Sequence, residues 1–512
     1  MTGQAVTDEA VRWLFGDQLG AHFADDTDHE RGGGFLIIES RRVFARRRFH
    51  RAKAHLVLSA MRHRAAELRE RVGEDRVRYV RSDTYGGALA DVSEPLQVIQ
   101  PTSWAALHFV RDLAETREIE RLPARGFVTT RDDFSAWAQG RDGKRLLMED
   151  FYRDARRRHG VLLDGSDPVG GSWNYDHENR EPPPKGQSTL GVDPPPWPVE
   201  DEIDEEVRAD LDRWESDGDV SFVGRDGPRI FAATSAEAEA VLEHFLAHRL
   251  PTFGAHEDAI LEDDPWMSHS LLSAPMNLGL LDPLDVVRRA EEVHRSGDAP
   301  LASVEGFVRQ VMGWRDYVWH LYWHLGEDYR RSNRLRQRRT IPDWFSDLDA
   351  GAVTARCLSQ TLEGVAERGW VHHIPRLMVL GSYALQRGWS PAELTDWFHR
   401  SFVDGYDWVM VPNVVGMSQH ADGGVLATKP YTSGGAYINT MSDHCSSCDY
   451  NPRVRVGEDA CPFTAGYWWF LDRHREDLAG NHRMARAVNG LDRLKDLPEL
   501  VEQEESRGSR AP

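Results

Sequence analysis

Two absences limit what this chain can be. No run of eighteen consecutive apolar residues occurs in its 512 residues, so we do not expect a transmembrane helix. The first residues, MTGQAVTDEAVRW, lack the basic and then apolar pattern of a secretory signal peptide. Hydrophobic residues make up 40% of the chain, with 17 tryptophans, which is typical of a globular protein rather than a disordered one. We therefore expect a cytoplasmic protein that has no membrane partner.

Positive charge is also scarce. The chain has 62 Lys and Arg against 83 Asp and Glu, a formal net charge of −21, which taken alone argues against binding to nucleic acid. The acidic excess, however, includes residues 199–219, whereas basic residues gather in 41–53 (RRVFARRRFHRAK) and 330–339 (RRSNRLRQRR). Each basic run is either a solvated surface or a strip that contacts phosphates.

A standard dinucleotide fingerprint is missing as well. The first apolar run, VRWLFG at 11–16, is followed by Asp17 and Gln18 and not by G-x-G-x-x-G. Further apolar runs at 35–38 and 77–80, with helical spacing between them, predict a parallel α/β layer. The later sequence is mostly helical in pattern. The predicted domains are an α/β domain (1–135), a connector with irregular acidic and Pro/Gly-rich segments (136–230), a large helical domain (231–500) and a flexible tail (501–512).

Cysteine is used sparingly and in one pattern. Three of the four cysteines form C-x2-C-x12-C, at Cys445, Cys448 and Cys461, and Cys357 is the fourth. A disulfide pair is disfavoured in a cytosolic chain. A four-cysteine zinc site and a 4Fe–4S cluster both suit this donor set, and the spacing alone does not decide between them.

Four helical segments carry polar residues that are weak signals one at a time. HSLLSAPMNLGLLDP (269–283) places serines near a probable helix start, where backbone amides can bind a phosphate, but an ordinary N-cap gives the same pattern. EGFVRQVMGWRDYV (305–318) and GWVHHIPRLM (369–378) place Trp, Arg and His at spacings that are also common in cores. FVDGYDWVMVPNVVGMSQHADGG (402–424) contains Asp404, which could pair with Arg376.

Taken in order, these segments resemble the photolyase/cryptochrome family, and most closely its bacterial iron–sulfur branch of photolyase-related proteins and prokaryotic (6-4) photolyases. The resemblance spans nearly the whole chain, from LFGDQL and FHRAKAHLVLSAMRH through GSDPVGGSWNYDHENR to YINTMSDHCSSC and CPFTAGYWWFL. It implies an N-terminal Rossmann-like antenna domain and a large all-α FAD-binding domain. It also implies that Cys357, Cys445, Cys448 and Cys461 ligate a 4Fe–4S cluster.

The resemblance assigns the remaining site residues. For FAD it implies His269, Ser270, Ser273, Asn277, Arg309, Gln310, Trp314, Arg315, Arg376, Asp404, Met410 and Asn413. For a 6,7-dimethyl-8-ribityllumazine antenna it implies Asp17, Gln18 and Glu39. The residues implied at the lesion are His373, His372, Tyr431 and Tyr437, and those implied in electron transfer to the flavin are Trp397 and Trp344.

The implied activity is light-driven repair of UV-damaged DNA. Photoexcited reduced FAD would donate an electron to a pyrimidine (6-4) photoproduct flipped out of the duplex, with His373 giving a proton as an imidazolium. Two other functions stay open: a cryptochrome-type photoreceptor without repair activity, and a light-independent nucleic-acid-binding scaffold. We expect a monomer.

Two positions depart from the branch. Met410 stands where the branch has Glu facing flavin N5, and a thioether cannot protonate or strongly hydrogen-bond that nitrogen. Phe398 and Asp349 stand where a redox-active Tyr and the distal Trp are usual. We therefore expect impaired or rerouted photoreduction, with Trp344 as the substitute.

Overall fold

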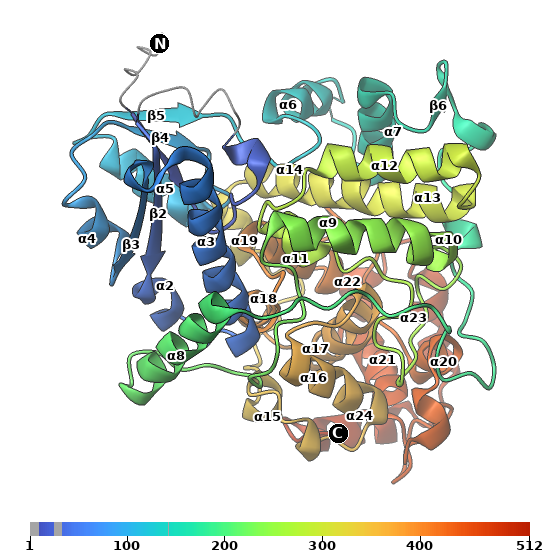
Figure 1. Ribbon diagram of the computed structural model, residues 1–512. Helices are drawn as coiled ribbons and strands as arrows, with labels where there is room; N and C mark the ends of the chain where they lie inside the picture. Colours follow the sequence, from blue (N-terminus) through green and yellow to red (C-terminus); the bar gives the residue numbers. More distant parts are fainter. Residues whose placement is uncertain (1–9, 25–32, 142) are drawn as a thin grey trace.

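The computed structural model describes residues 10–24, 33–141 and 143–512. Its N-terminal part is a five-stranded sheet in the order β3-β2-β1-β4-β5, and every pairing is parallel. The strands are β1 (Val11–Leu14), β2 (Phe35–Ser40), β3 (Val77–Ser82), β4 (Leu96–Ile99) and β5 (Ile119–Leu122). All residues of β1 and β2 are buried, as expected for central parallel strands that are covered on both faces. The predicted α/β layer is confirmed (Figure 1).

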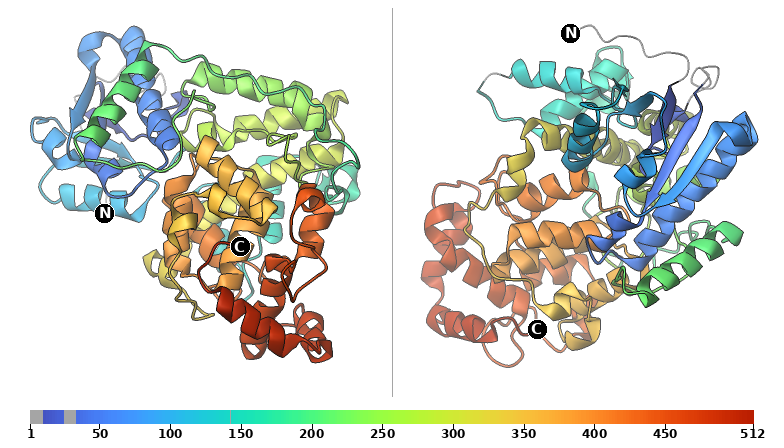
Figure 2. Two further views of the ribbon diagram at one scale, coloured as in Figure 1. Left: turned by 90° about the horizontal axis from the view of Figure 1, so that it is seen from below. Right: turned by 90° about the vertical axis from the view of Figure 1, so that its left-hand side faces the viewer.

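Five helices belong to this part or follow it directly: α2 (Arg41–Ala45), α3 (Arg51–Val72), α4 (Tyr85–Leu89), α5 (Trp104–Leu113) and α6 (Arg131–Gln139). The long helix α3 packs against β2, β3 and the later helix α8 (Glu202–Ser216). In Figures 1 and 2, α8 lies alongside the α/β domain, although more than 60 residues separate it from α6.

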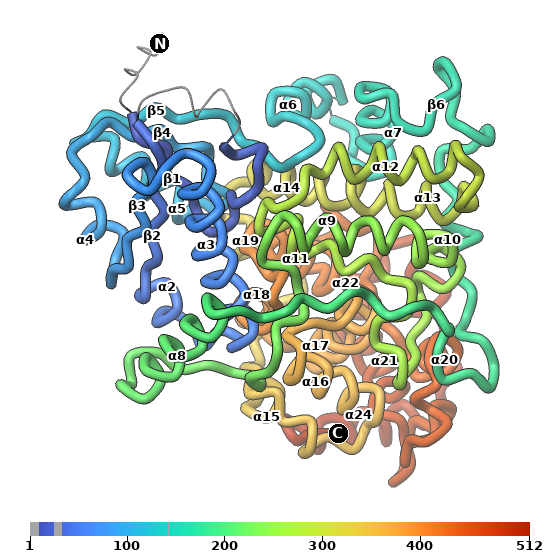
Figure 3. The backbone as a smooth tube through the Cα atoms, in the orientation of Figure 1, coloured from blue at the N-terminus to red at the C-terminus, as the bar shows by residue number. Residues whose placement is uncertain are grey.

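The acidic stretch of the predicted connector is a regular helix. Asp201 and Asp204 form a capping box at the start of α8, and the acidic first turn suits the positive end of the helix dipole. Val207, Leu211 and Trp214 recur at helical spacing and are buried. The expectation of an irregular acidic segment is therefore wrong there, whereas residues 179–201 lack helix and strand and cross the front of the helical part in Figure 3.

The rest of the chain is helical, which confirms the all-α part of the predicted fold. The connector contains α7 (Met148–His159) and the hairpin β6 (Leu163–Asp164) and β7 (Asp167–Pro168). The helical domain contains α9 (Ser235–His244), α10 (Leu250–Phe253), α11 (Ser273–Asn277), α12 (Pro283–Ser296), α13 (Leu301–Val308), α14 (Asp316–His324), α15 (Asp343–Ser346), α16 (Arg356–Arg368), α17 (Ser382–Arg387), α18 (Pro391–Ser401), α19 (Asp407–Met410), α20 (Gly435–Met441), α21 (Pro462–Arg473), α22 (Arg475–Leu478), α23 (Ala485–Gly490) and α24 (Leu497–Arg507).

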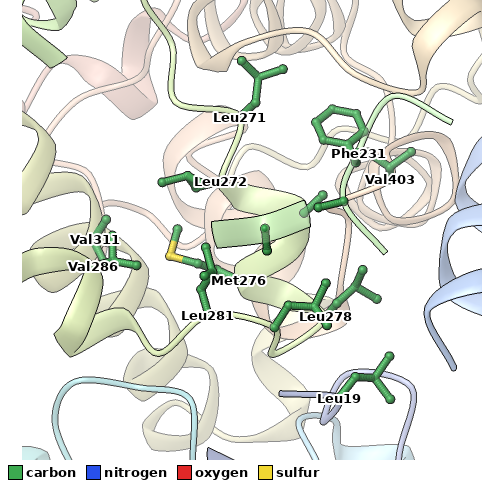
Figure 4. Close-up of a cluster of buried hydrophobic side chains, with 14 of the residues drawn as sticks. Leu19, Phe231, Leu271, Leu272, Met276, Leu278, Leu281, Val286, Val311 and Val403 are labelled. Carbon is green, nitrogen blue, oxygen red and sulfur yellow. The ribbon is translucent and has the colours of Figure 1, made fainter. Parts of the chain in front are cut away.

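The short helix α11 lies at the centre of the largest hydrophobic cluster. Figure 4 shows Met276 and Leu278 of this segment among side chains from distant elements, including Leu19 of the α/β domain and Val403 of the helical domain. One continuous core thus joins the two domains around the segment in which the sequence predicts phosphate contacts.

The C-terminal residues are packed, so the prediction of a flexible tail over 501–512 is wrong. Helix α24 buries Glu504, which pairs with Arg387 at 2.6 Å (Nη2–Oε2). The carbonyl oxygen of Pro512 accepts hydrogen bonds from the backbone N–H groups of Thr354 and Ala355. Within the described residues, none of the helices has the length and apolar character needed to cross a membrane.

Candidate active site and metal centre

An ion pair joins three of the four polar segments found in the sequence. Arg376 donates to both carboxylate oxygens of Asp404, at 2.8 and 3.0 Å. Ser273 Oγ donates to the same carboxylate at 2.7 Å, and Asn277 Nδ2 donates to the backbone carbonyl of Asp404 at 3.0 Å. The predicted Arg376–Asp404 pair is therefore confirmed. The hydrogen bonds from Ser273 and Asn277 hold Asp404 in position.

Three π-helical stretches hold half of the residues that the sequence places around FAD. Arg309–Arg315 carries Arg309, Gln310, Trp314 and Arg315; Pro375–Gly381 carries Arg376; and Val411–Ser418 carries Asn413. π-Helical turns are rare and occur frequently at functional sites. The sequence analysis did not predict these π-helical turns. One signal for them was present, because each stretch contains one glycine inside an apolar helical pattern. At Gly381 an added Cβ would lie 2.2 Å from Ser418 Oγ, so the close approach of two of these stretches requires glycine.

The FAD candidates on the Arg309–Arg315 stretch have different partners. Arg309 is buried, with Nη1 3.2 Å from Asp176 Oδ1, while its Nε and Nη2 have no hydrogen-bond partner among the described residues. Gln310 donates to Glu257 at 2.6 Å. Arg315 instead donates to the carbonyls of Gly126 and Met276, which ties it to the α/β side of the molecule.

Three other candidates contribute packing or local bonds. Trp314 is half-buried and meets Tyr317 edge-on. Met410 is buried in the second hydrophobic cluster. Asn413 Nδ2 donates to Val409 within its own helix, at 2.9 Å. Their contact with a flavin stays a prediction.

Strained backbone marks the segment of His269 and Ser270. Leu271 next to Ser270 has φ = +58° and Met267 has φ = +41°, a region that non-glycine residues seldom adopt. Ser270 Oγ accepts from the backbone N–H of Leu272 at 3.3 Å. The strain sets the path of the chain into α11.

Three histidines gather beside this segment. His269 and His372 stack with ring centroids 4.2 Å apart, and His269 Nε2 and His372 Nδ1 are buried without hydrogen-bond partners in the described part of the chain. Burial lowers the pKa of His269 to about 3, and burial together with the charge of Arg376 lowers that of His373 to about 4. The side chain of His373 is exposed to solvent, with Arg376 as its charged neighbour. It is therefore neutral at neutral pH in the free protein, and the predicted imidazolium requires added negative charge nearby.

Tyr431 and Tyr437 share one electrostatic environment. Burial raises the pKa of both phenols, and Arg180 acts on each of them. Asp258 is a further charged neighbour of both, and Asp176, the partner of Arg309, acts on Tyr431. These tyrosines therefore lie close to the Arg309–Gln310 region.

The four cysteines line one space. Cys357 on α16, Cys445, Cys448 and Cys461 before α21 surround one small space together with His444 and Tyr450. None of the four forms a disulfide. Burial raises the pKa of the Cys357 thiol, and the other three cysteines raise it further. A bound cation or cluster would offset this mutual repulsion, so the donor set fits a tetrathiolate metal centre, either zinc or iron–sulfur.

Comparison with known proteins identifies the family. Residues 12–219 match the family model described as deoxyribodipyrimidine photo-lyase-related protein. A (6-4) photolyase from Agrobacterium fabrum (strain C58) is 41% identical over 453 residues, which is 85% of this chain and 86% of that protein. The chain belongs to the photolyase/cryptochrome family.

Solved structures of photolyases and cryptochromes share its fold. A class III photolyase from Agrobacterium tumefaciens superposes with a TM-score of 0.58 over 99% of this chain and 98% of that one, at 13% identity. A cryptochrome from Synechocystis sp. PCC6803 gives a TM-score of 0.57 over 86% and 87% of the two chains, also at 13% identity.

The three residues predicted to bind the antenna chromophore form two groups, which differ in their position and hydrogen bonding. Asp17 and Gln18 follow β1 at the point where the strand order reverses between β1 and β4, which is where open α/β sheets bind ligands. Asp17 accepts from Thr102, and Gln18 donates to the carbonyl of Ile99 at 3.3 Å. Glu39 instead bonds to neighbouring side chains: its carboxylate accepts hydrogen bonds from Arg62 at 2.9 and 3.1 Å and from Tyr79 at 2.6 Å.

The two predicted electron-transfer residues belong to one aromatic array. Trp397 is buried and its ring lies 4.5 Å from that of Phe345, which lies 4.7 Å from Trp389. Trp389 lies 6.0 Å from Trp344, whose Nε1 donates to the carbonyl of Ser509 near the surface. Sequence reasoning missed Trp389. Asp349 caps a short turn and is exposed.

Most cations of the first basic run pair within the protein, and phosphate contact stays a prediction for this run. Arg51 lies 3.0 Å from Glu215 of α8 and also binds Asp212. Lys53 is buried and donates to the carbonyl of His399 at 2.6 Å. The other pairs of this run are Arg41 with Asp219 and Asp83, Arg47 with Asp396, and Arg48 with Asp347.

The second basic run is more open. Arg330 pairs with Asp407 at 3.1 Å, and Arg336 pairs with Asp477 at 2.7 Å. The arginines of this run that are exposed are Arg331, Arg334, Arg336, Arg338 and Arg339. Phosphate contact therefore stays a prediction for 330–339.

Proposed function

We propose that this protein repairs UV-damaged DNA in blue light by reversing pyrimidine (6-4) photoproducts. The observation that carries the proposal is the 41% identity to a (6-4) photolyase over 85% of the chain, together with an Arg376–Asp404 pair in the segments where the family resemblance requires it. Identity of this extent makes a shared reaction far more plausible than a shared fold alone.

The residues present fit FAD in the helical domain. Buried ring nitrogens of His269 and His372 have no hydrogen-bond partner among the described residues, and a bound polar cofactor would satisfy such groups. When bound, FAD supplies the light-driven electron chemistry. The protein contributes the Arg376–Asp404 pair, which holds a guanidinium at a fixed place in the pocket, and His373, which is kept neutral until a lesion arrives.

The four-cysteine centre is proposed to hold a 4Fe–4S cluster. Its ligands come from α16, the turn at His444–Ser447 and the start of α21, so the centre ties together elements that are about 90 residues apart in sequence. A ribityllumazine is proposed for the α/β domain at Asp17 and Gln18. Glu39 would contact this chromophore directly only if its ion pair with Arg62 opened. Otherwise it would act through Arg62 and Tyr79, which donate hydrogen bonds to its carboxylate.

The deciding experiment is repair of a defined oligonucleotide. Purified protein with its flavin reduced is mixed with DNA that carries one (6-4) photoproduct, and intact pyrimidines are quantified after blue light and after darkness. We expect light-dependent repair of this lesion and none of a cyclobutane dimer. Absence of repair by flavin-loaded protein that binds the lesion would refute the proposal.

A photoreceptor without repair activity is the second candidate. Met410 is buried where the branch has a glutamate, and Phe398 and Asp349 replace residues of the usual electron path. A light-driven flavin change without repair in the experiment above would favour it.

A further inference from the structure

We propose that Glu257 binds the flipped-out lesion as a neutral carboxylic acid and donates its proton in a hydrogen bond to a pyrimidine carbonyl oxygen. Glu257 lies outside every set of residues predicted from the sequence. The inference rests on the proposed function, and it makes Glu257 a specificity-determining residue for damaged DNA.

The position of Glu257 links the flavin side and the lesion side of the site. Its Oε1 accepts a hydrogen bond from Gln310 Nε2 at 2.6 Å, so the amide beside the predicted flavin pocket fixes one carboxyl oxygen. The adjacent Asp258 is a charged neighbour of Tyr431 and Tyr437, the two tyrosines predicted at the lesion. The side chain of Glu257 is half-buried, and no hydrogen bond within the described residues involves its second oxygen, Oε2.

Two buried polar groups near Glu257 lack hydrogen-bond partners. Asn179 is 2% exposed and its Oδ1 has no hydrogen-bond partner among the described residues; the same holds for Nη2 of Arg309, which is 4% exposed. Gly306 lies close to both side chains, because a Cβ there would lie 2.5 Å from Asn179 Nδ2 and 3.4 Å from Glu257 Oε2. Buried polar groups without partners are costly, and a ligand with donors and acceptors would satisfy them.

These groups also include residues of a sequence motif that is not among the residues predicted at the FAD site or at the cluster site. Asp176, Asn179 and Arg180 belong to NYDHENR, one of the segments that carry the family resemblance. Asn179 Nδ2 donates to the carbonyl of Ala302 at 3.0 Å, which fixes the motif against the helix that leads into the Arg309–Arg315 stretch.

Burial, more than the surrounding charges, favours the neutral form of Glu257. Burial raises the pKa of Glu257 to about 8; Arg309 opposes the rise, whereas Asp258, Asp176 and Glu305 add to it. A carboxylic acid that is neutral at pH 7 offers an O–H donor, whereas a carboxylate can only accept. Pyrimidine carbonyls are acceptors, so only the neutral acid matches them.

The test is the pH dependence of lesion binding in the dark. Affinities of the flavin-loaded protein for a (6-4) oligonucleotide and for its undamaged counterpart are measured by fluorescence anisotropy from pH 6.5 to 9. For the wild type we expect the preference for the lesion to fall about tenfold between pH 7 and 9, because ionisation removes the donor. Glu257→Gln keeps an N–H donor and does not titrate, so its preference should stay within about twofold of the pH 7 wild-type value throughout.

Two further variants complete the design. Glu257→Leu removes the donor and should lose about tenfold in preference at pH 7, the size of one well-placed hydrogen bond. Asp263→Asn, an exposed acid six residues away, should behave like the wild type and controls for the loss of a negative charge. The infrared spectrum of the lesion-free protein gives an independent readout, because a protonated-carboxyl band should disappear between pH 7 and 9 in the wild type and be missing in Glu257→Gln.

The outcomes separate the two proposals. Lesion preference with the same pH profile in wild type and Glu257→Gln, or no titrating carboxyl band, would overturn the role of Glu257 and leave the proposed function standing. No lesion preference in the wild type at any pH would overturn the proposed function and this inference together.

Discussion

Replacing Arg229 with methionine should loosen the packing of helix α8. The Arg229 side chain is 2% exposed and that of Asp204, on α8, is 0% exposed. The guanidinium donates to both oxygens of Asp204, at 2.9 and 3.0 Å, and to both oxygens of Glu237, at 2.7 and 3.0 Å. Methionine keeps most of the volume and leaves Asp204 as a buried carboxylate without its main partner.

The expected magnitude follows from burial. Removing one partner of a buried ion pair costs about 3–5 kcal/mol, because the other charge stays desolvated. If α8 opens as a local unit, amide exchange in 202–216 should accelerate by about two to four orders of magnitude. Arg225→Met is the matched control: it lies four residues earlier, is exposed, and pairs with Glu363 at 2.6 Å, so the change should stay within about tenfold.

Hydrogen exchange followed by mass spectrometry on peptides from α8 and α3 measures both effects. Burial alone would raise the pKa of Asp204, but the neighbouring His63 and the hydrogen bonds from Arg229 hold that pKa well below its usual range. The stability that this group contributes is therefore present above about pH 4 and is lost only as the pH falls further. Equal exchange rates in Arg229→Met and Arg225→Met at pH 7 would refute the reasoning.

Four further results are expected. Cys357→Ser should lower the iron and acid-labile sulfide content of the purified protein well below that of the wild type; a full content of zinc with no iron in the wild type would instead identify a zinc site. His373→Ala should lower repair by about 10²–10⁴-fold, the range for loss of a general acid, while lesion binding changes little; repair at the wild-type rate would exclude His373. Trp344→Phe and Trp389→Phe should each slow flavin photoreduction measured by absorbance, whereas Trp104→Phe, which lies outside this array, should not; unchanged rates in both would exclude the array as a route. Neutralising Arg334 and Arg338 together should reduce the slope of log affinity for DNA against log salt by about 1–2, and neutralising Arg47 and Arg48 should not; the reverse pattern would restore the first basic run as the phosphate contact.

The sequence predicts this fold well because its signals are periodic. The apolar runs at 35–38 and 77–80 are strands β2 and β3. The pairing of Arg376 with Asp404 was also predictable, since the family resemblance places both residues in motifs. The gathering of the four cysteines around one space follows from the same resemblance.

What the sequence does not predict depends on partners that are distant along the chain. In the sequence, the cations of 41–53 have no visible acidic partners and could bind phosphate. In the fold, α8 brings Asp212 to Arg51, and α18 brings Asp396 to Arg47. The neutral state of His373 depends on Arg376 and on surrounding protein. Glu257 stands in no recognisable motif of polar residues, and its elevated pKa arises from folding. The packed C-terminus likewise depends on Arg387, which lies 117 residues before its partner Glu504.

The position of α8 has a consequence for the order of events during translation. Arg51 at the start of α3 finds Asp212 and Glu215 only after the ribosome has made the residues up to Ser216, 144 residues beyond the end of α3 at Val72. At about 5–20 residues per second this interval is about 7–30 s. During it, the nascent α/β domain presents the α3 surface without its cover, and the strand-like pairing of Phe49 and Arg51 with Val223 is also incomplete. The α/β domain is thus still incomplete when synthesis passes residue 135, and a nascent chain released before residue 223 would expose a surface that chaperones can bind.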